Sequence, residues 1–222
     1  MANFYSCCGK DICIGCIYAM IKRGGENMEL CPFCRTPGSA ADDDEIKRID
    51  ILMEKGNADA FYQLAGFYKN GDMGLPQDET KANELYLKAG QLGCADGYFN
   101  LGIAYYNGKG VEIDKTKVKL YLELAAMMGD VSARNNLGVM EYNVGNHERA
   151  FKHNIIAARA GDSKCLENVK NGFMTGLVVT KNEYESTLRA YHETQIEMKS
   201  EARDKAAVIL AEIDASRSRS GA

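Results

Sequence analysis

The central part of the chain repeats itself, and this repetition limits the possible folds more than any other feature of the sequence. Gly93, Gly129 and Gly161 each close one unit, and they are spaced by 36 and then 32 residues. Inside each unit, small residues and leucine recur at helical spacing, as Ala60 and Leu64 do in the first unit. A single unit of this size cannot bury its own apolar face, so neighbouring units must stack on one another. The sequence therefore predicts an all-α solenoid of antiparallel helix pairs.

The units can be aligned position by position. The first helix of each unit carries a branched aliphatic residue at the same place, and these residues are Leu64, Leu101, Leu137 and Val169. The second helix carries a stripe that should face the core, namely Ala82, Leu85, Tyr86 and Ala89, then Val118, Tyr121, Leu122 and Ala125, then Ala150, His153, Asn154 and Ala157. The turn between the two helices contains two glycines in units one and two, and it shortens to residues 144–147 in unit three. The shorter turn explains the 32-residue spacing.

This pattern resembles the Sel-one-like repeats (SLR), which are glycine-rich relatives of the tetratricopeptide repeat, over residues 45–200. Residues 58–71 and 78–93 carry the motif most completely. The resemblance implies a right-handed α-solenoid whose concave face binds peptides or protein surfaces. A protein partner on the repeat surface is therefore expected.

A long helix is predicted at the C-terminal end, over residues 181–217. This segment contains neither glycine nor proline. Apolar and amide residues recur in it at steps of four or three, giving one stripe of Tyr184, Leu188, Tyr191, Gln195, Met198, Ala202, Ala206, Ile209 and Ile213. Two roles are open for such a helix. It caps the final repeat, or it pairs with a second copy to form a homodimer.

Six of the eight cysteines lie within the first 34 residues, before a linker at residues 37–44. The paired Cys-x-x-Cys spacing is typical of cysteines that bind a metal ion as thiolates, which we expect in a reducing compartment. The competing interpretation is a redox-active pair at Cys13 and Cys16. A tetrahedral zinc site takes four ligands, and no histidine precedes His147. Six cysteines can therefore close at most one such site within a single chain.

The register Cys8-Gly-x-x-Ile-Cys13-x-x-Cys16 followed by Cys31-Pro-x-Cys34-Arg35 is similar to the second half of an all-cysteine RING finger, so residues 1–36 resemble a partial RING-type zinc module. The resemblance implies one zinc ion on four ligands, and these are Cys7, Cys8, Cys31 and Cys34. It leaves Cys13 and Cys16 as half of a second site. It also implies contacts with a ubiquitin-conjugating enzyme through Ile17, Tyr18, Pro32 and Arg35.

Three explanations are open for the missing first cysteine pair. The chain begins downstream of it, or the module is a decayed RING kept as a zinc-stabilised cap for the repeats. In the third explanation, the Cys13 and Cys16 pairs of two chains close one shared zinc site in a dimer.

Other classes of function are disfavoured by composition. The net charge of −4 and a pI near 5.5 give no electrostatic footprint for nucleic acid. No run of about 18 apolar residues or signal-peptide pattern is present, so an intracellular soluble protein of the cytoplasm or nucleus is expected. The three histidines, His147, His153 and His192, have no neighbours at a ligand or triad spacing, and we expect no catalytic residue.

Together these features predict a protein-interaction scaffold or adaptor that carries a zinc-binding RING remnant. One alternative is a RING-type E3 ubiquitin ligase whose repeats select the substrate. Another is a purely structural repeat protein whose cysteines bind no metal.

Overall fold

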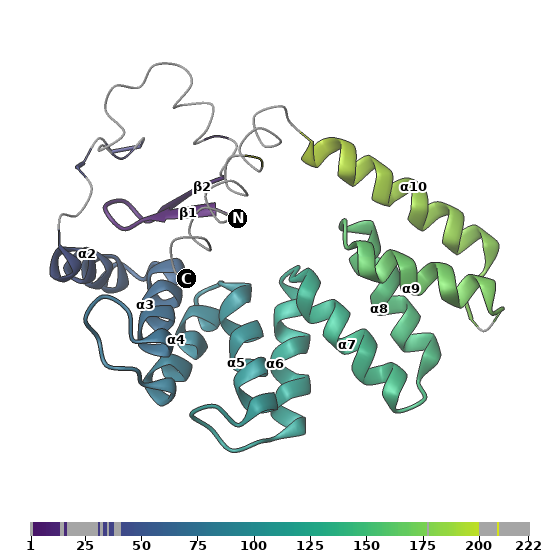
Figure 1. Ribbon diagram of the computed structural model, residues 1–222, viewed down its shortest axis with the longest axis horizontal. Helices are drawn as coiled ribbons and strands as arrows, with labels where there is room; N and C mark the ends of the chain where they lie inside the picture. Colours follow the sequence, from purple (N-terminus) through teal and green to yellow (C-terminus); the bar gives the residue numbers. More distant parts are fainter. Residues whose placement is uncertain are drawn as a thin grey trace, which may run out of the picture.

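The computed structural model describes residues 2–13, 16, 31, 33, 34, 36, 37, 41–176, 178–199 and 208. A small strand pair precedes a series of helices that follow one another in an arc (Figure 1). The strands are β1 (Ala2–Tyr5) and β2 (Lys10–Cys13). The helices are α2 (Asp42–Glu54), α3 (Ala58–Asn70), α4 (Glu79–Gln91), α5 (Ala95–Asn107), α6 (Lys115–Met127), α7 (Val131–Asn143), α8 (His147–Arg159), α9 (Ser163–Met174) and α10 (Lys181–Met198).

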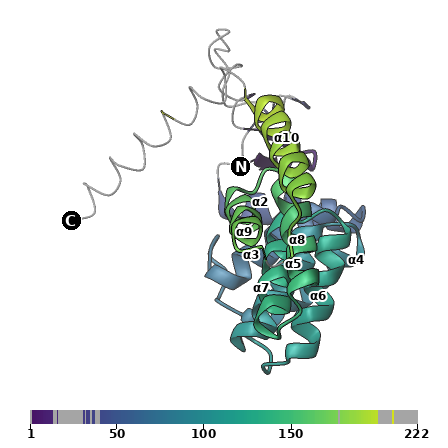
Figure 2. The ribbon, with the colours of Figure 1, turned by 90° about the vertical axis from the view of Figure 1, so that its right-hand side faces the viewer.

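Antiparallel helix pairs build the main body, as the repeat pattern predicts. Helices α3 and α4, α5 and α6, and α7 and α8 pack as pairs, and each pair also packs on the next. Figure 2 shows the same stack from the end that carries α9 and α10, with α10 in the foreground. The prediction of an all-α helical solenoid is confirmed for this part of the chain.

Aspartate and asparagine side chains fix where most repeat helices begin. The side chains of Asn57, Asp78 and Asp162 accept hydrogen bonds from backbone N–H groups in the first turns of α3, α4 and α9. Helices α3 and α5 end at Gly71 and Gly108, which adopt the left-handed conformation that a side chain disfavours. These caps therefore set where the repeat helices begin and end.

The core runs along the inside of the stack. The expected leucine positions are buried, together with the small residues that let the helices approach, among them Ala60, Ala89, Ala125, Ala133 and Ala157. At Gly97 an added Cβ atom would lie 2.6 Å from the Tyr86 carbonyl oxygen, so only glycine permits this approach of α5 to α4. Asn83, Glu141 and Asn154 are the polar exceptions in the described part of the repeats, since all three are buried.

Helix α10 closes the far end of the stack. It begins with a capping box formed by Thr180 and Glu183, and it packs on α8 and α9 with Thr187 fully buried. This packing is that of a cap over the final repeat. The helix stops at Met198, because Lys199 adopts extended backbone, and so it differs from the uninterrupted helix expected over 181–217. Beyond Lys199 only Val208 lies within the described residues.

The N-terminal module contains an antiparallel β-hairpin that the sequence analysis did not anticipate. Strand β1 pairs with β2 in a register that places Ala2 opposite Cys13 and Tyr5 opposite Lys10. Strands of four residues are too short for an alternating apolar pattern to reveal them. Helix α2 begins at Asp42, inside the expected linker, because four acidic residues fill its first turn and favour the helix N-terminus.

Among the described residues, two hydrogen bonds join the module to the first helices. Asn57 Nδ2 donates to the Gly9 carbonyl oxygen at 3.3 Å, and Arg48 Nη1 donates to the Pro37 carbonyl oxygen at 2.9 Å. Gly9 has a φ of 65°, and a Cβ atom there would lie 2.6 Å from Asn57 Nδ2. The hairpin turn therefore approaches the α2–α3 corner through a position that requires glycine.

Candidate metal centre and repeat surface

Four cysteines of the N-terminal module converge on one point. The Sγ atoms of Cys7, Cys8, Cys31 and Cys34 all lie within 4.8 Å of one another. Cys8 Sγ is 3.6 Å from Cys31 Sγ, and Cys34 Sγ is 3.4 Å from Cys7 Sγ. Four thiolates around one zinc ion, each at about 2.3 Å, would lie about 3.8 Å apart. The residues present therefore fit a tetrahedral all-cysteine zinc site.

Local backbone geometry explains how two adjacent cysteines face the same point. Side chains of neighbouring residues in extended backbone point to opposite sides. Cys7 and Cys8 escape this rule because they lie in the Ser6–Gly9 turn that connects β1 to β2. On the other side of the site, Cys31 N–H donates to the Thr36 carbonyl oxygen at 2.8 Å, which closes the loop that carries Cys31 and Cys34.

The pKa values of three of the four thiols are shifted, and not all in the same direction. Burial raises the pKa of Cys7 and of Cys8, and the neighbouring thiols raise both further. Hydrogen bonds from Thr36 lower the pKa of Cys34 to about 6. Without a cation the pKa values favour a thiolate at Cys34 and neutral thiols at Cys7 and Cys8, since adjacent thiolates repel one another. A divalent metal ion would supply the positive charge that lets all four ionise.

The remaining predicted residues of the module are less fully placed. Cys16 is exposed. Cys13 lies in β2 opposite Ala2 of β1, but its side chain is outside the part that the structure describes. Ile17, Tyr18, Pro32 and Arg35 also lie outside the described residues. In the part that the structure describes, Cys7, Cys8, Cys31 and Cys34 form the one group of three or more potential metal ligands.

The repeats share a lysine–aromatic contact that changes in the third unit. Lys81 Nζ lies 4.0 Å from the centre of the Tyr68 ring, and Lys117 Nζ lies 4.8 Å from that of Tyr105. Glu141 occupies the tyrosine position of the third repeat and is only 3% exposed. The sequence alignment of the repeats contains this substitution, but its partners become visible only in the structure.

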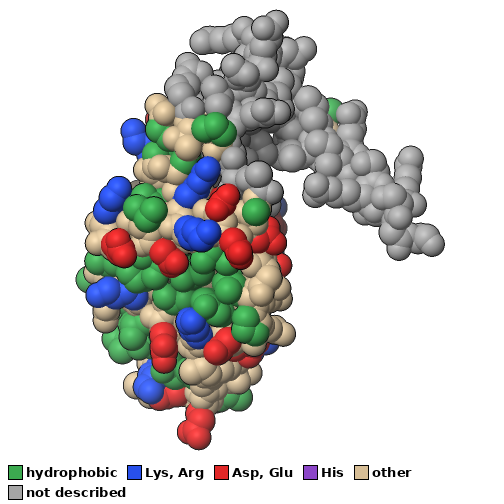
Figure 3. Space-filling model, turned by 90° about the vertical axis from the view of Figure 1, so that its left-hand side faces the viewer, with side chains coloured by type: hydrophobic (Ala, Val, Ile, Leu, Met, Phe, Trp, Pro, Cys, Tyr) green, Lys and Arg blue, Asp and Glu red, His purple; other side chains and the backbone are tan. Residues whose placement is uncertain are grey.

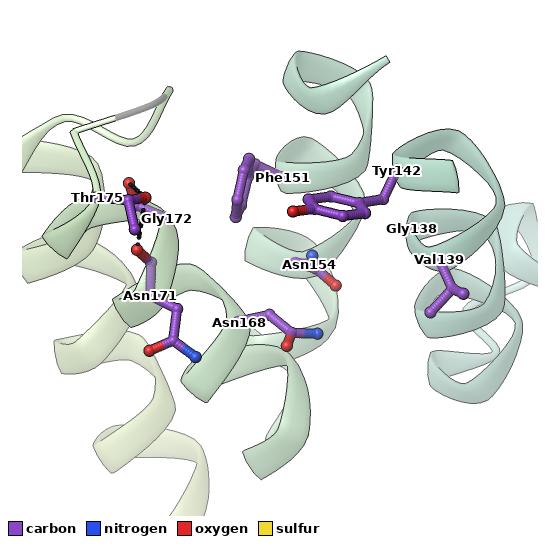
Figure 4. A pocket seen from close by; sticks show the side chains of 9 residues that line it. All are labelled: Gly138, Val139, Tyr142, Phe151, Asn154, Asn168, Asn171, Gly172 and Thr175. Carbon is purple, nitrogen blue, oxygen red and sulfur yellow. Dashed lines mark hydrogen bonds between the residues drawn. The ribbon is translucent and has the colours of Figure 1, made fainter. Parts of the chain in front are cut away.

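A cavity of about 320 Å³ opens between α7 and α9, with α8 behind it (Figure 4). It is lined by Gly138, Val139, Tyr142, Phe151, Asn154, Asn168, Asn171, Gly172 and Thr175. The ring centres of Tyr142 and Phe151 are 6.5 Å apart and the rings are nearly perpendicular. None of the lining residues is charged. Sequence reasoning placed Asn154 in the core stripe and did not identify this cavity, although a polar residue at a core position is the signal that marks it.

Comparison with known proteins identifies the repeats. A family model described as Sel1 repeat matches residues 58–94, 95–130 and 131–162. The crystal structure of a Sel1 repeat protein from Oxalobacter formigenes superposes with a TM-score of 0.58 at 21% identity, over 81% of this chain and 71% of that one. The antigen c5321 of uropathogenic Escherichia coli, which displays an SLR fold, superposes with a TM-score of 0.59 at 22% identity, over 83% of this chain and 38% of that one.

Two Arabidopsis thaliana proteins are similar in sequence. The ERAD-associated E3 ubiquitin-protein ligase component HRD3B is 35% identical over 102 residues, which are 45% of this chain and 15% of the relative. The corresponding component HRD3A is 36% identical over 69 residues, which are 31% of this chain and 10% of the relative. The chain thus spans a small part of the length of both relatives. None of the helices that the structure describes is long and apolar enough to cross a membrane. Residues 58–162 therefore match three Sel1 repeats in sequence, and the solenoid that they form has the fold of Sel1 repeat proteins.

Proposed function

We propose that this chain is a protein-interaction scaffold, in which the Sel1 repeats bind a protein partner and the N-terminal cysteines bind one zinc ion. The observation that carries the proposal is the stack of three Sel1 repeats whose helix α7 exposes Val139 and Tyr142 at the mouth of a cavity. Each of these two side chains is 49% exposed. Exposed apolar and aromatic side chains next to a concave site are typical of binding surfaces.

The wider surface supports the same proposal. Figure 3 looks at the side of the molecule where Figure 1 places α2 and the first repeats. Hydrophobic side chains gather there among lysine, arginine, aspartate and glutamate side chains. An apolar centre with a charged rim is the usual anatomy of a protein–protein interface.

The role of zinc in this proposal is structural. Cys7, Cys8, Cys31 and Cys34 would be its ligands, and zinc with four protein ligands has no open position for a substrate. The ion would join the hairpin turn to the Cys31–Cys34 loop. Because Gly9 of that turn accepts a hydrogen bond from Asn57, the site would also fix the module against the first repeat.

A photocrosslinking experiment tests the scaffold function directly. The photoreactive residue p-benzoylphenylalanine replaces Tyr142 in the full chain, and a matched control carries it at Glu148, an exposed residue of α8. We expect discrete protein adducts from position 142 that are competed by unmodified chain and are absent from position 148. Identical adduct patterns at both positions, or no adduct at either, would contradict a partner-binding surface on α7.

One comparison favours a second function, as a component of a ubiquitin-ligase assembly. The relative HRD3B is by its name a component of an E3 ubiquitin-protein ligase, and the cysteine module of this chain resembles half of a RING finger. In this second proposal the repeats select the substrate and the module contacts a ubiquitin-conjugating enzyme through Ile17, Tyr18, Pro32 and Arg35. Discharge of ubiquitin from a charged conjugating enzyme, lost in Arg35→Ala, would support it. Inactivity that persists after an upstream Cys-x-x-Cys is restored would exclude it.

A further inference from the structure

The cavity between α7 and α9 has a smaller counterpart at an earlier repeat boundary. This second cavity, of about 130 Å³, is lined by residues of α3, α4 and α5. When the repeats are aligned, the two cavities share three positions, which hold Asn100, Ala104 and Asn107 in the smaller cavity and Asn168, Gly172 and Thr175 in the larger one. The α3–α5 cavity and the α7–α9 cavity are therefore the same site at two repeat boundaries, and their differences show what each can bind.

The two cavities differ in charge. Lys69, Glu79 and Lys109 line the α3–α5 cavity, whereas none of the described residues that line the α7–α9 cavity is charged. Tyr142 holds in α7 the position that Lys69 holds in α3. A charged group inside the α7–α9 cavity would lose its water without gaining a counter-ion. Charge complementarity therefore selects an uncharged occupant for the α7–α9 cavity.

The asparagine amides of the two cavities also differ. In the α3–α5 cavity, Asn100 Oδ1 accepts from Lys69 Nζ at 3.4 Å, and Asn100 Nδ2 donates to the carbonyl oxygen four residues earlier at 3.0 Å. In the α7–α9 cavity, the side chains of Asn168 and Asn171 are exposed and make no hydrogen bond to another described residue. Asn154, the third asparagine of that lining, is 5% exposed and belongs to the packed floor. A ligand can therefore bond to Asn168 and Asn171 without breaking a contact within the protein.

Two facing walls give the α7–α9 cavity the shape of a short groove. Val139 and Tyr142 are three residues apart on α7, and Asn168 and Asn171 are three residues apart on α9. Side chains at this spacing lie on one face of a helix, with about 5–6 Å between their Cβ atoms. Figure 4 shows Phe151 of α8 between the two helices. The groove therefore has an apolar wall, an amide wall and an aromatic floor.

We infer that this groove binds an uncharged, extended segment of the partner protein. Backbone N–H and C=O groups of the segment bond to the amides of Asn168 and Asn171. One aliphatic side chain of the segment packs on Val139 and Tyr142. The inference rests on the proposed function and deepens it by naming the chemistry of the bound segment.

The amide wall matches an extended chain in chemistry and in spacing. An asparagine amide both donates and accepts hydrogen bonds, as a peptide group does. In an extended chain, residues two apart present their backbone groups along the same edge, about 6.4–6.8 Å from one another. This distance is close to the separation of the Asn168 and Asn171 side chains. A helical segment would not match, because its backbone groups are already paired with one another.

Nuclear magnetic resonance of the isotope-labelled full chain tests the inference at the amides themselves. The probe is the peptide acetyl-Thr-Leu-Thr-amide, which is uncharged and whose β-branched residues favour an extended chain. On titration, the side-chain amide signals of Asn168 and Asn171 should move, and those of Asn100 and Asn107 in the α3–α5 cavity should not. The analogue in which every backbone N–H group is methylated should bind about tenfold more weakly or worse, since it cannot donate to the asparagine oxygens.

Variants locate the binding site. Asn171→Val places in α9 the residue that α7 carries at the aligned position, Val139, and removes one amide from the groove. The affinity for the probe should fall about two- to tenfold. Asn107→Ala is the matched control, because Asn107 is an exposed asparagine that lines the α3–α5 cavity, and it should bind the probe as the natural chain does. Because Asn171 is exposed, the thermal unfolding midpoint of Asn171→Val should stay unchanged, so that weaker binding does not reflect unfolding.

Three results would overturn the inference. They are unmoved signals of Asn168 and Asn171, equal binding of the methylated analogue, and shifts confined to Asn100 and Asn107. Photocrosslinking at Tyr142 separates this failure from failure of the proposed function. Adducts at Tyr142 without movement of the asparagine signals would leave the scaffold function standing and reject the extended segment as the occupant of the groove.

Discussion

Lys119 of repeat two donates a hydrogen bond to Glu141 of repeat three, with 2.8 Å between Nζ and Oε1. The Glu141 side chain is 3% exposed, and its other oxygen accepts from Asn146 Nδ2 at 2.8 Å. Arg149 Nη2 lies 3.8 Å from Glu141 Oε1. Glu141 holds the place of Tyr68 and Tyr105 in the earlier repeats. The buried Glu141 carboxylate thus links α6 to α7 and α8 through its hydrogen-bond donors. Repeats one and two have a tyrosine ring in contact with a lysine at the same position.

Removal of one partner should expose the cost of this buried charge. Lys119→Met leaves Glu141 with its closest cation gone, and we expect the free energy of unfolding to fall by about 1–3 kcal/mol. Lys115→Met is the matched control, since Lys115 is exposed at the start of the same helix, and it should change stability by less than about 0.5 kcal/mol. Urea unfolding measures both. Equal effects of the two variants would show that the pair does not stabilise the repeat contact.

The same pair predicts a dependence of stability on pH. Hydrogen bonds from Lys119 and then Asn146 lower the pKa of Glu141. A carboxyl group with a lowered folded-state pKa stabilises the fold above its unfolded pKa of about 4.3, and this contribution disappears as the pH falls through the folded-state value. The stability difference between the natural chain and Glu141→Gln should therefore be constant near neutral pH and shrink below about pH 4. Thermal unfolding across this range measures it, and a difference that grows with acid would contradict the assignment.

Asn57 should couple the cysteine module to the repeats. Its Oδ1 accepts from Ala60 N–H at 2.9 Å and so caps α3, while its Nδ2 donates to the Gly9 carbonyl oxygen. Asn57→Asp keeps the cap and removes the donor, whereas Asn57→Ala removes both and should cost about 1 kcal/mol more. Hydrogen exchange should speed up in β1 and β2 for both variants. Unchanged exchange in the hairpin would show that this contact does not hold the module.

The turn of repeat two that contains Gly110 packs closely on the start of α4 in repeat one, at Glu79. A Cβ atom at Gly110 would lie 2.7 Å from the Glu79 carbonyl oxygen, and φ there is 66°. Gly74 has a φ of 70° and nothing within 4 Å of an added Cβ atom. Gly110→Ala should therefore destabilise the fold by about 1–3 kcal/mol more than Gly74→Ala, because only the first variant adds a backbone clash to the conformational strain. Chemical unfolding of the two variants compares them. Equal losses would mean that the two repeats do not touch at this turn.

Periodic features of this chain could be predicted from its sequence, and single contacts could not. The core stripe, the glycines that close each unit and the short third turn all follow from local spacing, which one repeat after another reinforces. The β-hairpin could not be predicted, because its strands are short and its stability depends on contacts with Asn57 and the cysteine loop. The cavity and the Glu141 pair depend on which side chains of three helices meet, and spacing along one helix does not contain that information.

The cysteine module also combines a feature that could be predicted from the sequence with one that could not. The resemblance to half of a RING finger implied Cys7, Cys8, Cys31 and Cys34 as one ligand set, and the structure brings their sulfur atoms together. The Ser6–Gly9 turn that lets adjacent cysteines do this depends on a hairpin. Binding of zinc to the set stays a prediction that needs a direct measurement.

Native mass spectrometry of the full chain makes that measurement, since it reports bound zinc and oligomeric mass together. We predict one zinc ion on a monomer, lost in Cys31→Ser and retained in Cys94→Ala, whose cysteine is buried in the repeats. Three zinc ions on a dimer would instead show a site shared through Cys13 and Cys16. A folded chain without zinc, or a Cys31→Ser variant that keeps its zinc, would contradict the four-cysteine centre.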